Sequence, residues 1–139
     1  MAKTTVQPYL FFAGRCEEAL EFYRKSIGAE IIVLRRFKEA PEPVPNLPDC
    51  FDDKVMHATV QIGDSMWMAS DGQREGNQNF EGFSMSITVP DASEANRVFA
   101  ALSEDGLVVM PLEKTFWTSS FGVVQDRFGV SWMVSIEHK

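Results

Sequence analysis

Histidine is the side chain best suited to move a proton near neutral pH, and this chain contains only two. His138 lies at the end of the chain, whereas His57 lies inside the apolar, β-branched segment 55–62. His57 could act as a general base or as a hydrogen-bond donor to a ligand. It could equally be a structural histidine that bonds to a neighbouring strand. Asp71, close by in sequence, could orient His57 or cap the loop that it begins.

Three segments, 55–62, 82–89 and 130–136, alternate apolar residues with uncharged polar ones. Alternation of period two predicts strands with one face in the core. The opposite faces carry no Lys, Glu or Arg, which favours a moderately polar ligand cleft over a plain solvent-facing sheet. We expect the cleft to be lined by Thr59, Met68, Ser84, Ser86 and Met133, with His57 as the candidate catalytic residue.

Two adjacent aromatic residues, Phe116 and Trp117, fall at an expected turn between strands. They could wall a ligand pocket, or they could belong to the hydrophobic core. We include Trp117 among the candidate ligand-binding residues.

The composition excludes several classes of partner. The net charge is −7 and the isoelectric point is about 4.8, so we expect no nucleic-acid partner. The chain contains no run of Lys or Arg residues, so we expect no membrane partner either. The two cysteines form no CxxC pair, which favours reduced thiols over a disulfide framework. The N-terminal apolar run reaches only to Phe12, which is short for a signal peptide, so we expect a cytoplasmic protein.

Hydrophobic period and turn residues predict the order strand–helix–strand–strand–strand, twice over. Gly28 should end the first helix, and Gly106 should cap the second. Asp91 and Glu94 form a capping-box pattern at the start of that second helix. Four of the seven prolines lie within 38–54, which predicts a loop. The expected strands are 6–13, 29–37, 55–62, 65–70, 82–89, 107–112, 118–125 and 130–136, and the expected helices are 15–27 and one that opens at Asp91.

Short segments spread over nearly the whole chain are similar to those of a known family. They are PYLFF (8–12), EEALEFY (17–23) followed by Gly28-Ala29, VMHA (55–58), MASD (68–71), TFW (115–117) and DRFGVSWM (126–133). Together they resemble the PhnB-like branch, often labelled demethylubiquinone-methyltransferase-like, of the vicinal-oxygen-chelate (glyoxalase/bleomycin resistance/dioxygenase) superfamily. The resemblance implies one α+β domain over residues 1–139. It would contain two βαβββ modules, about 4–72 and 81–137, whose curled mixed sheets form a cleft.

Enzymes of this superfamily usually bind a divalent ion through His and Glu side chains on strands one, four, five and eight. The matching positions here hold Pro8 or Gln7, Trp67 or Met68, Ser84, and Met133. Proline, methionine and serine do not supply the imidazole and carboxylate ligands that such an ion needs. We therefore expect no metal site and no other cofactor.

The sequence thus predicts a PhnB-like protein that binds a small apolar or aromatic-containing molecule without a metal ion. One alternative is an enzyme: a metal-dependent lyase, isomerase or dioxygenase with unusual ligands, or a metal-free one that uses His57. Another is a structural or regulatory domain without a small ligand. The absence of any GxG motif argues against a methyltransferase with a bound methyl donor. We also expect a homodimer, because each half-sheet would leave an exposed edge.

Overall fold

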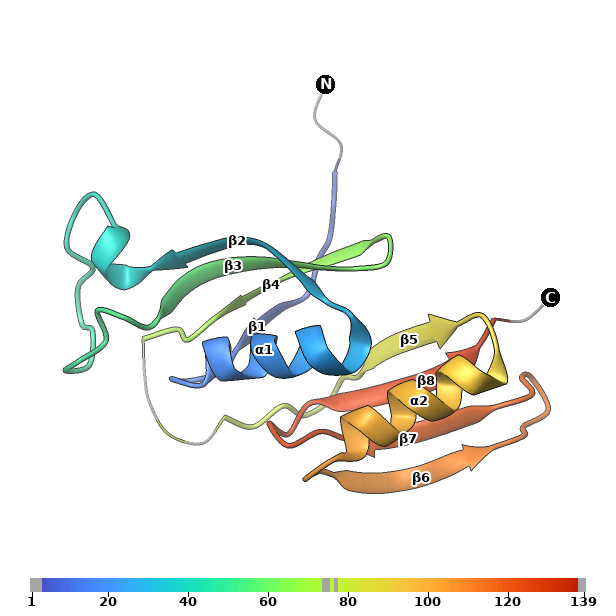
Figure 1. Ribbon diagram of the computed structural model, residues 1–139. Coiled ribbons are helices and arrows are strands. Elements are labelled where there is room, and N and C mark those ends of the chain that lie inside the picture. The colour runs from blue at the N-terminus through green and yellow to red at the C-terminus, as the bar shows by residue number, and fades with distance from the viewer. Residues whose placement is uncertain (1–3, 74–75, 77, 138–139) are drawn as a thin grey trace. The chain divides into compact units, whose positions relative to one another are not determined.

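The computed structural model describes residues 4–73, 76 and 78–137 and divides into two compact units, residues 1–78 and 79–139. Each unit contains one α-helix and one mixed four-stranded sheet (Figure 1). The predicted α+β class and the predicted order strand–helix–strand–strand–strand are confirmed in both units. The curling of the sheets and the cleft stay predictions.

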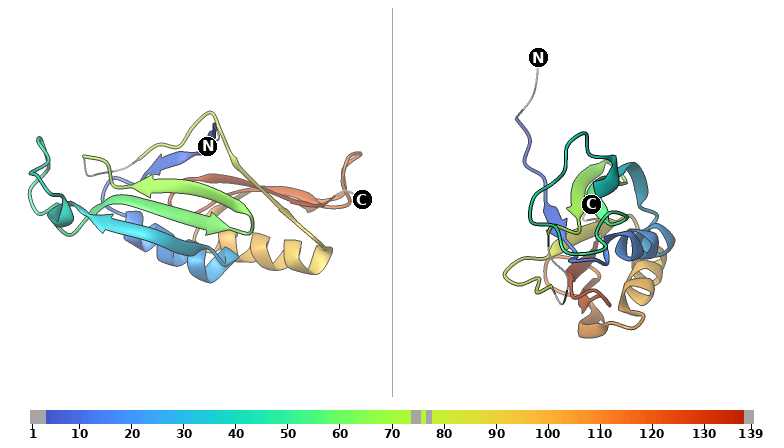
Figure 2. Two further views of the ribbon diagram at one scale, coloured as in Figure 1. Left: turned by 90° about the horizontal axis from the view of Figure 1, so that it is seen from above. Right: turned by 90° about the vertical axis from the view of Figure 1, so that its left-hand side faces the viewer.

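The sheet of the first unit has the strand order β1-β4-β3-β2, in which β1 is parallel to β4 and the other neighbours are antiparallel. Within the described part of this unit, helix α1 covers one face of the sheet and no α-helix covers the other, which we call the open face (Figure 2). The elements are β1 (Tyr9–Phe11), α1 (Cys16–Ile27), β2 (Glu30–Arg36), a short 3₁₀ turn (Phe37–Glu39), β3 (Val55–Ile62) and β4 (Ser65–Ser70).

Helix α1 buries its predicted apolar stripe and stops where the sequence indicates. The buried residues of the helix include Leu20 and Tyr23, on which the sheet packs. Gly28 follows the helix with φ +72°, and its N–H donates to the Tyr23 carbonyl. Glycine adopts this left-handed conformation without steric cost, which explains the stop. The expected strand 6–13 is shorter than predicted, since only Tyr9–Phe11 pairs with β4.

Asp71 holds the ends of four elements of the first unit together. Its side chain is buried, with Oδ1 accepting from the N–H groups of Gly14 and Cys16 and Oδ2 accepting from the N–H of Val55, each at 2.8 Å. Gly14 lies between β1 and α1 and Cys16 begins α1, while Val55 begins β3 and Asp71 itself follows β4. A carboxylate that accepts several backbone N–H groups supplies strong hydrogen bonds in place of water.

The sheet of the second unit has the matching order β5-β8-β7-β6, again with a parallel first pair, β5 and β8. Helix α2 packs on one face, where Gly122 of β7 lies against the Phe99 ring so closely that a Cβ atom would stand 2.8 Å from it. The elements are β5 (Met85–Val89), α2 (Ala92–Ser103), β6 (Leu107–Glu113), β7 (Phe121–Gln125) and β8 (Ser131–Ile136).

The start of α2 is as predicted, but its end is not. Asp91 is the N-cap, and its side chain accepts from the Glu94 N–H at 2.8 Å. The helix ends at Ser103, and Glu104 rather than Gly106 is the C-cap. Gly106 has a different role, because a Cβ there would stand 2.3 Å from the Gln125 carbonyl oxygen. Glycine is needed for this close approach of two backbones, not for the helix cap.

Replacing Asp71 tests its role as an anchor. In Asp71→Asn, the amide group must turn its NH₂ toward at least one of the N–H donors, so we expect a loss of about 3 kcal/mol in the free energy of unfolding. The exposed cap variant Asp91→Ala should cost only about 1 kcal/mol. Urea denaturation of both variants measures the difference. Equal losses would show that Asp71 is an ordinary cap.

Cys16 provides a second test, because its thiol is fully buried while Cys50 is exposed. Burial, and then the nearby Asp71 carboxylate, hold the pKa of the Cys16 thiol well above its usual range. The unfolded chain therefore ionises this thiol at lower pH than the folded chain, and alkaline pH should weaken the fold. With Ellman's reagent at pH 8, we expect Cys50 to react at once and Cys16 only after denaturation. The Cys50→Ser variant should show no fast reaction.

Candidate functional site

The open face of the first sheet carries a hydrogen-bonded chain centred on His57. The Tyr9 hydroxyl lies 3.0 Å from His57 Nδ1, and His57 Nε2 lies 3.2 Å from the Thr59 hydroxyl. Tyr9 comes from β1, and the other two residues lie two positions apart on β3, so all three project from the face that α1 does not cover. The chain of three side chains is partly exposed and within reach of a ligand.

This arrangement gives each ring nitrogen of His57 a hydroxyl partner. A neutral imidazole donates to one hydroxyl and accepts from the other, whereas a protonated imidazole donates to both. Partial burial raises the pKa of the Tyr9 phenol above its usual value, so Tyr9 stays a protonated donor at neutral pH. The protonation state and tautomer of His57 therefore determine which of the two hydroxyl groups, Tyr9 or Thr59, can point its proton toward a ligand.

Aromatic and thioether groups surround this chain. Tyr9 stacks on Phe11 with ring centres 4.9 Å apart, and Met68 of β4 lies between Tyr9 and Thr59 in the strand register. Arg35 of β2 is paired with His57 across the ladder and adds a cation on that side. The structure thus brings together three of the predicted residues, His57, Thr59 and Met68. An aromatic platform with a few polar groups is typical of small-molecule sites.

Asp71 does not orient His57, contrary to one of the two roles that the sequence left open. Both of its carboxylate oxygens accept backbone N–H groups of Gly14, Cys16 and Val55. Its role is the capping one, although it caps the start of α1 rather than its own loop. The hydrogen-bond partner of His57 on a neighbouring strand is Tyr9 instead. Nothing in the sequence indicates this pairing, because Tyr9 is distant from His57 in the chain and is not a carboxylate.

The open face of the second sheet carries the other predicted polar residues. Ser86 of β5 is directly opposite Met133 of β8. Ser84, just before β5, shares a 2.7 Å hydrogen bond with the Ser131 hydroxyl, and Thr88 and Ser135 lie 3.5 Å apart in the same way. These hydroxyls largely bond to one another across the two strands. Over β5 and β8 this face is uncharged, as predicted, with Met133 partly exposed among the hydroxyls, but β7 adds the apolar side chains of Phe121 and Val123 to it.

Trp117 does not belong to a strand of either sheet, and its side chain is not in the hydrophobic core. It sits in the turn between β6 and β7 and is 48% exposed, while its neighbour Phe116 is 96% exposed. Their rings meet edge to face at 4.7 Å, and Trp117 meets Phe121 in the same way at 5.3 Å. The core interpretation is therefore wrong for this pair.

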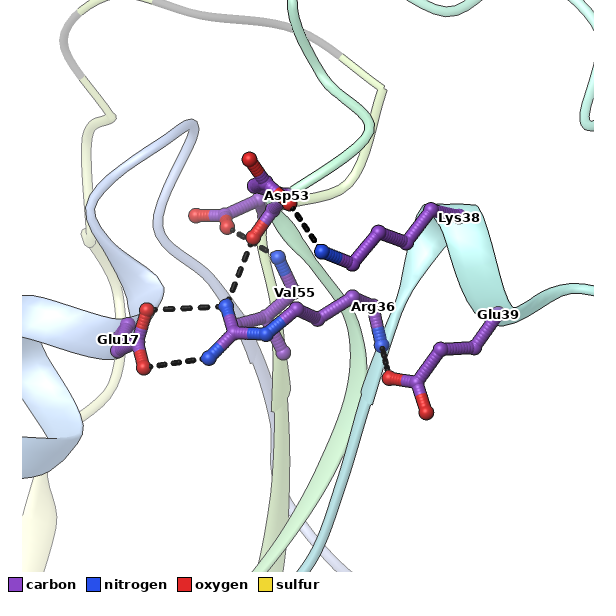
Figure 3. Close-up of polar contacts among 7 residues, drawn as sticks. Glu17, Arg36, Lys38, Glu39, Asp53 and Val55 are labelled. Carbon is purple, nitrogen blue, oxygen red and sulfur yellow. Dashed lines mark hydrogen bonds and ion pairs between the residues drawn. The ribbon is translucent and has the colours of Figure 1, made fainter.

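A charged depression of about 300 Å³ near the start of α1 is a structural cluster rather than a ligand site (Figure 3). Arg36 binds the Glu17 carboxylate with both terminal nitrogens, at 2.7 and 3.0 Å, and also donates to the Asp53 carbonyl. Lys38 pairs with the Asp53 carboxylate, and Lys54 donates to the Gly14 carbonyl. The hydrogen bond from Arg36 lowers the pKa of Glu17. These bonds join α1 and β2 to the segment just before β3, so the charged groups of this cluster already have ion-pair or hydrogen-bond partners.

The residues at the positions where the superfamily binds a divalent metal ion are not suitable ligands for such an ion. Pro8 and Met68, with Ser84 and Met133 of the second unit, offer neither imidazole nor carboxylate. Over residues 4–73, 76 and 78–137, no three His, Cys, Asp or Glu side chains are grouped to hold a metal ion. His138 lies outside the described residues.

Residues 4–135 match the protein family described as 3-demethylubiquinone-9 3-methyltransferase. The chain belongs to this family. Protein YjdN of Escherichia coli (strain K12) is 34% identical over 138 residues, which cover 94% of each chain. The crystal structure of protein PA1353 from Pseudomonas aeruginosa shares 40% identity with a TM-score of 0.84, over 99% of this chain and all of that one.

Two further solved structures are similar to this chain, one a PhnB protein and the other a more distant protein with the same fold. A putative 3-demethylubiquinone-9 3-methyltransferase, PhnB protein, from Bacillus cereus shares 29% identity with a TM-score of 0.79, over 96% of this chain and all of that one. A glyoxylase/bleomycin resistance protein/dioxygenase domain from Frankia sp. EAN1pec has 11% identity and a TM-score of 0.66, over 99% of this chain and all of that one. The PhnB relationship is thus confirmed, and the fold is glyoxalase-like. No helix within the described ranges is long and apolar enough to cross a membrane.

Proposed function

We propose that this protein binds a small, uncharged, aromatic-containing molecule on the open face of the β1-β4-β3-β2 sheet without using a metal ion. The observation that carries the proposal is the Tyr9–His57–Thr59 chain, since it places polar groups on a face otherwise rich in aromatic and thioether surface. A ligand ring would stack near Tyr9 and Phe11, while a ligand hydroxyl or carbonyl would bond to the chain.

The arrangement favours binding over general base catalysis by His57. A general base needs a nitrogen lone pair directed at the substrate. Here Nδ1 and Nε2 both have hydroxyl partners within the protein, at 3.0 and 3.2 Å. His57 would have to give up one of these bonds before accepting a proton from a substrate. The family description names a methyltransferase, but the chain has no GxG motif to hold a methyl donor, and we propose no methyl transfer.

Binding and metal content can be tested together. We expect 1-naphthol, titrated in NMR experiments, to shift the resonances of Tyr9, His57 and Met68. His57→Ala should weaken this binding about fivefold, roughly the worth of one hydrogen bond, and Tyr9→Phe should weaken it less. Asn96→Ala, on the exposed side of α2, is the control. Elemental analysis of protein as isolated should find far less than one transition-metal ion per chain.

Two results would contradict the proposal. One is close to one equivalent of zinc, nickel, manganese or iron in the native protein that is lost in His57→Ala, which would favour the metalloenzyme alternative. The other is unchanged naphthol binding in both His57→Ala and Tyr9→Phe, which would make His57 a structural residue.

We also propose that the protein is a homodimer, in which β6 contributes to the interface. β6 is an edge strand, and four successive apolar residues from Leu107 to Met110 are exposed on it. By contrast, the edge strand β2 of the first sheet is charged, since it carries Glu30, Arg35 and Arg36. Edge strands of soluble proteins are normally protected by charge, so an apolar one favours a partner strand.

Light scattering at micromolar concentration measures this directly. We expect a mass twice the 15.6 kDa of one chain, and a shift toward the single-chain mass in Val109→Lys, because a buried lysine would oppose strand pairing. Ile32→Lys, on the edge strand of the other sheet, is the matched control. A single-chain mass for the native protein rules the dimer out.

A further inference from the structure

The turn between β6 and β7 borders an open depression of about 440 Å³ that belongs wholly to the second unit. This volume is within the range of small-molecule sites. The depression lies at the ends of β5 and β8, and its lining shares no residue with the Tyr9–His57–Thr59 chain. Its lining includes Pro90, Lys114, Phe116, Trp117, Ile136 and Glu137.

The turn is built to hold its aromatic residues outward. The Thr115 hydroxyl accepts from the N–H groups of Trp117 and Thr118, and the Thr115 N–H donates to the Thr118 carbonyl at 3.0 Å. The buried Thr118 hydroxyl lies 3.3 Å from both the Ser120 and Ile136 carbonyl oxygens, which ties the turn to β8. Phe116 and Trp117 are thus exposed on a fixed backbone rather than on a loose loop.

Fixed, exposed aromatic rings are the usual anchors of binding sites. Phe116 is almost fully exposed and meets Trp117 edge to face, and Trp117 in turn meets Phe121 in the same way. Pro90 and Ile136 add apolar surface to the same depression. The apolar part of an occupant should therefore be a planar ring that packs against Phe116 or Trp117.

The charges on the rim limit the occupant further. Lys114 and Glu137 both line the depression, and within the part of the chain that the structure describes neither has an ion-pair partner. A ligand with only a carboxylate would meet Glu137 unfavourably, and a ligand with only an ammonium would meet Lys114 in the same way. A molecule that carries both groups complements both charges.

We propose that this depression is a second binding site, for a small zwitterionic aromatic molecule of the aromatic α-amino acid class. The ring packs on the Phe116–Trp117 pair, the carboxylate faces Lys114, and the ammonium faces Glu137. This site is independent of the one proposed around His57, since it uses other residues and another ligand chemistry.

Three matched probes test the proposal: L-phenylalanine, 3-phenylpropionate, which lacks the ammonium, and phenethylamine, which lacks the carboxylate. Each is titrated into the full-length protein while amide NMR shifts are followed at residues 114–119 and 137. Fluorescence gives a second readout, because Trp117 is exposed whereas Trp67 and Trp132 are buried. We expect phenylalanine to bind at least threefold more tightly than either analogue, the scale of one exposed ion pair.

Variants assign each part of the site. Phe116→Ala should weaken all three probes about tenfold, as loss of an aromatic anchor does. In Lys114→Gln, phenylalanine should no longer bind more tightly than phenethylamine. In Glu137→Gln, phenylalanine should no longer bind more tightly than 3-phenylpropionate. Phe83→Ala, which removes a 45% exposed ring elsewhere in the unit, should change nothing. These substitutions are at exposed positions, so folding should be preserved, which circular dichroism checks.

The proposal is overturned if no shifts appear at residues 114–119 at millimolar probe, or if the three probes bind equally. It is also overturned if Phe116→Ala leaves probe binding unchanged but lowers the mass in light scattering, because a second copy would then cover the ring. Naphthol binding at the His57 face is read at Tyr9, His57 and Met68, so failure of one site is distinguishable from failure of the other.

Discussion

The first unit depends on one buried carboxylate. The chain leaves β1 through Ala13 and Gly14, both with positive φ, and turns at once into α1, which leaves backbone N–H groups facing inward without helix partners. Asp71 accepts two of these N–H groups and a third from Val55 at the start of β3. Without it, three backbone donors, two of them fully buried, would lack this acceptor, and the helix would lose its fixed position over the sheet.

That anchor also determines what the open face can present. β1 is only three residues long, and its place beside β4 is fixed at one end by the turn that Asp71 holds. Tyr9 reaches His57 because β1 lies in this register, with Tyr9 opposite Met68. The second unit contains a comparable device in Asp126, which is buried and accepts from the N–H groups of Phe128 and Val130 and from the Trp132 indole. In both units a buried aspartate fixes a turn, and the turn fixes aromatic side chains.

Local patterns in the sequence predicted the elements and the faces of the strands well. The alternation in 55–62 placed Ala58 and Val60 in the core and His57 and Thr59 outside, and both placements are confirmed. The pairing of Tyr9 with His57 could not be predicted, because it depends on the register of β1 against a strand far along the chain. Gly106 was assigned from a helix-end rule, whereas its actual constraint is a carbonyl of another strand. Contacts distant in sequence leave no periodic signal.

The parallel pairing of the first and last strands in each unit has a consequence for how the chain folds. In the first unit β2–β3 and β3–β4 pair strands that are neighbours in sequence, but β1 can only pair once Met68 to Ser70 are available. The same holds for β5, which waits for β8. Contacts between distant segments are slow to form because of the entropy of closing the intervening chain. On a ribosome, the first strand to emerge from each half would therefore be the last to be incorporated, and in the first unit the Tyr9 and Phe11 rings that β1 carries would reach their places only at that final step.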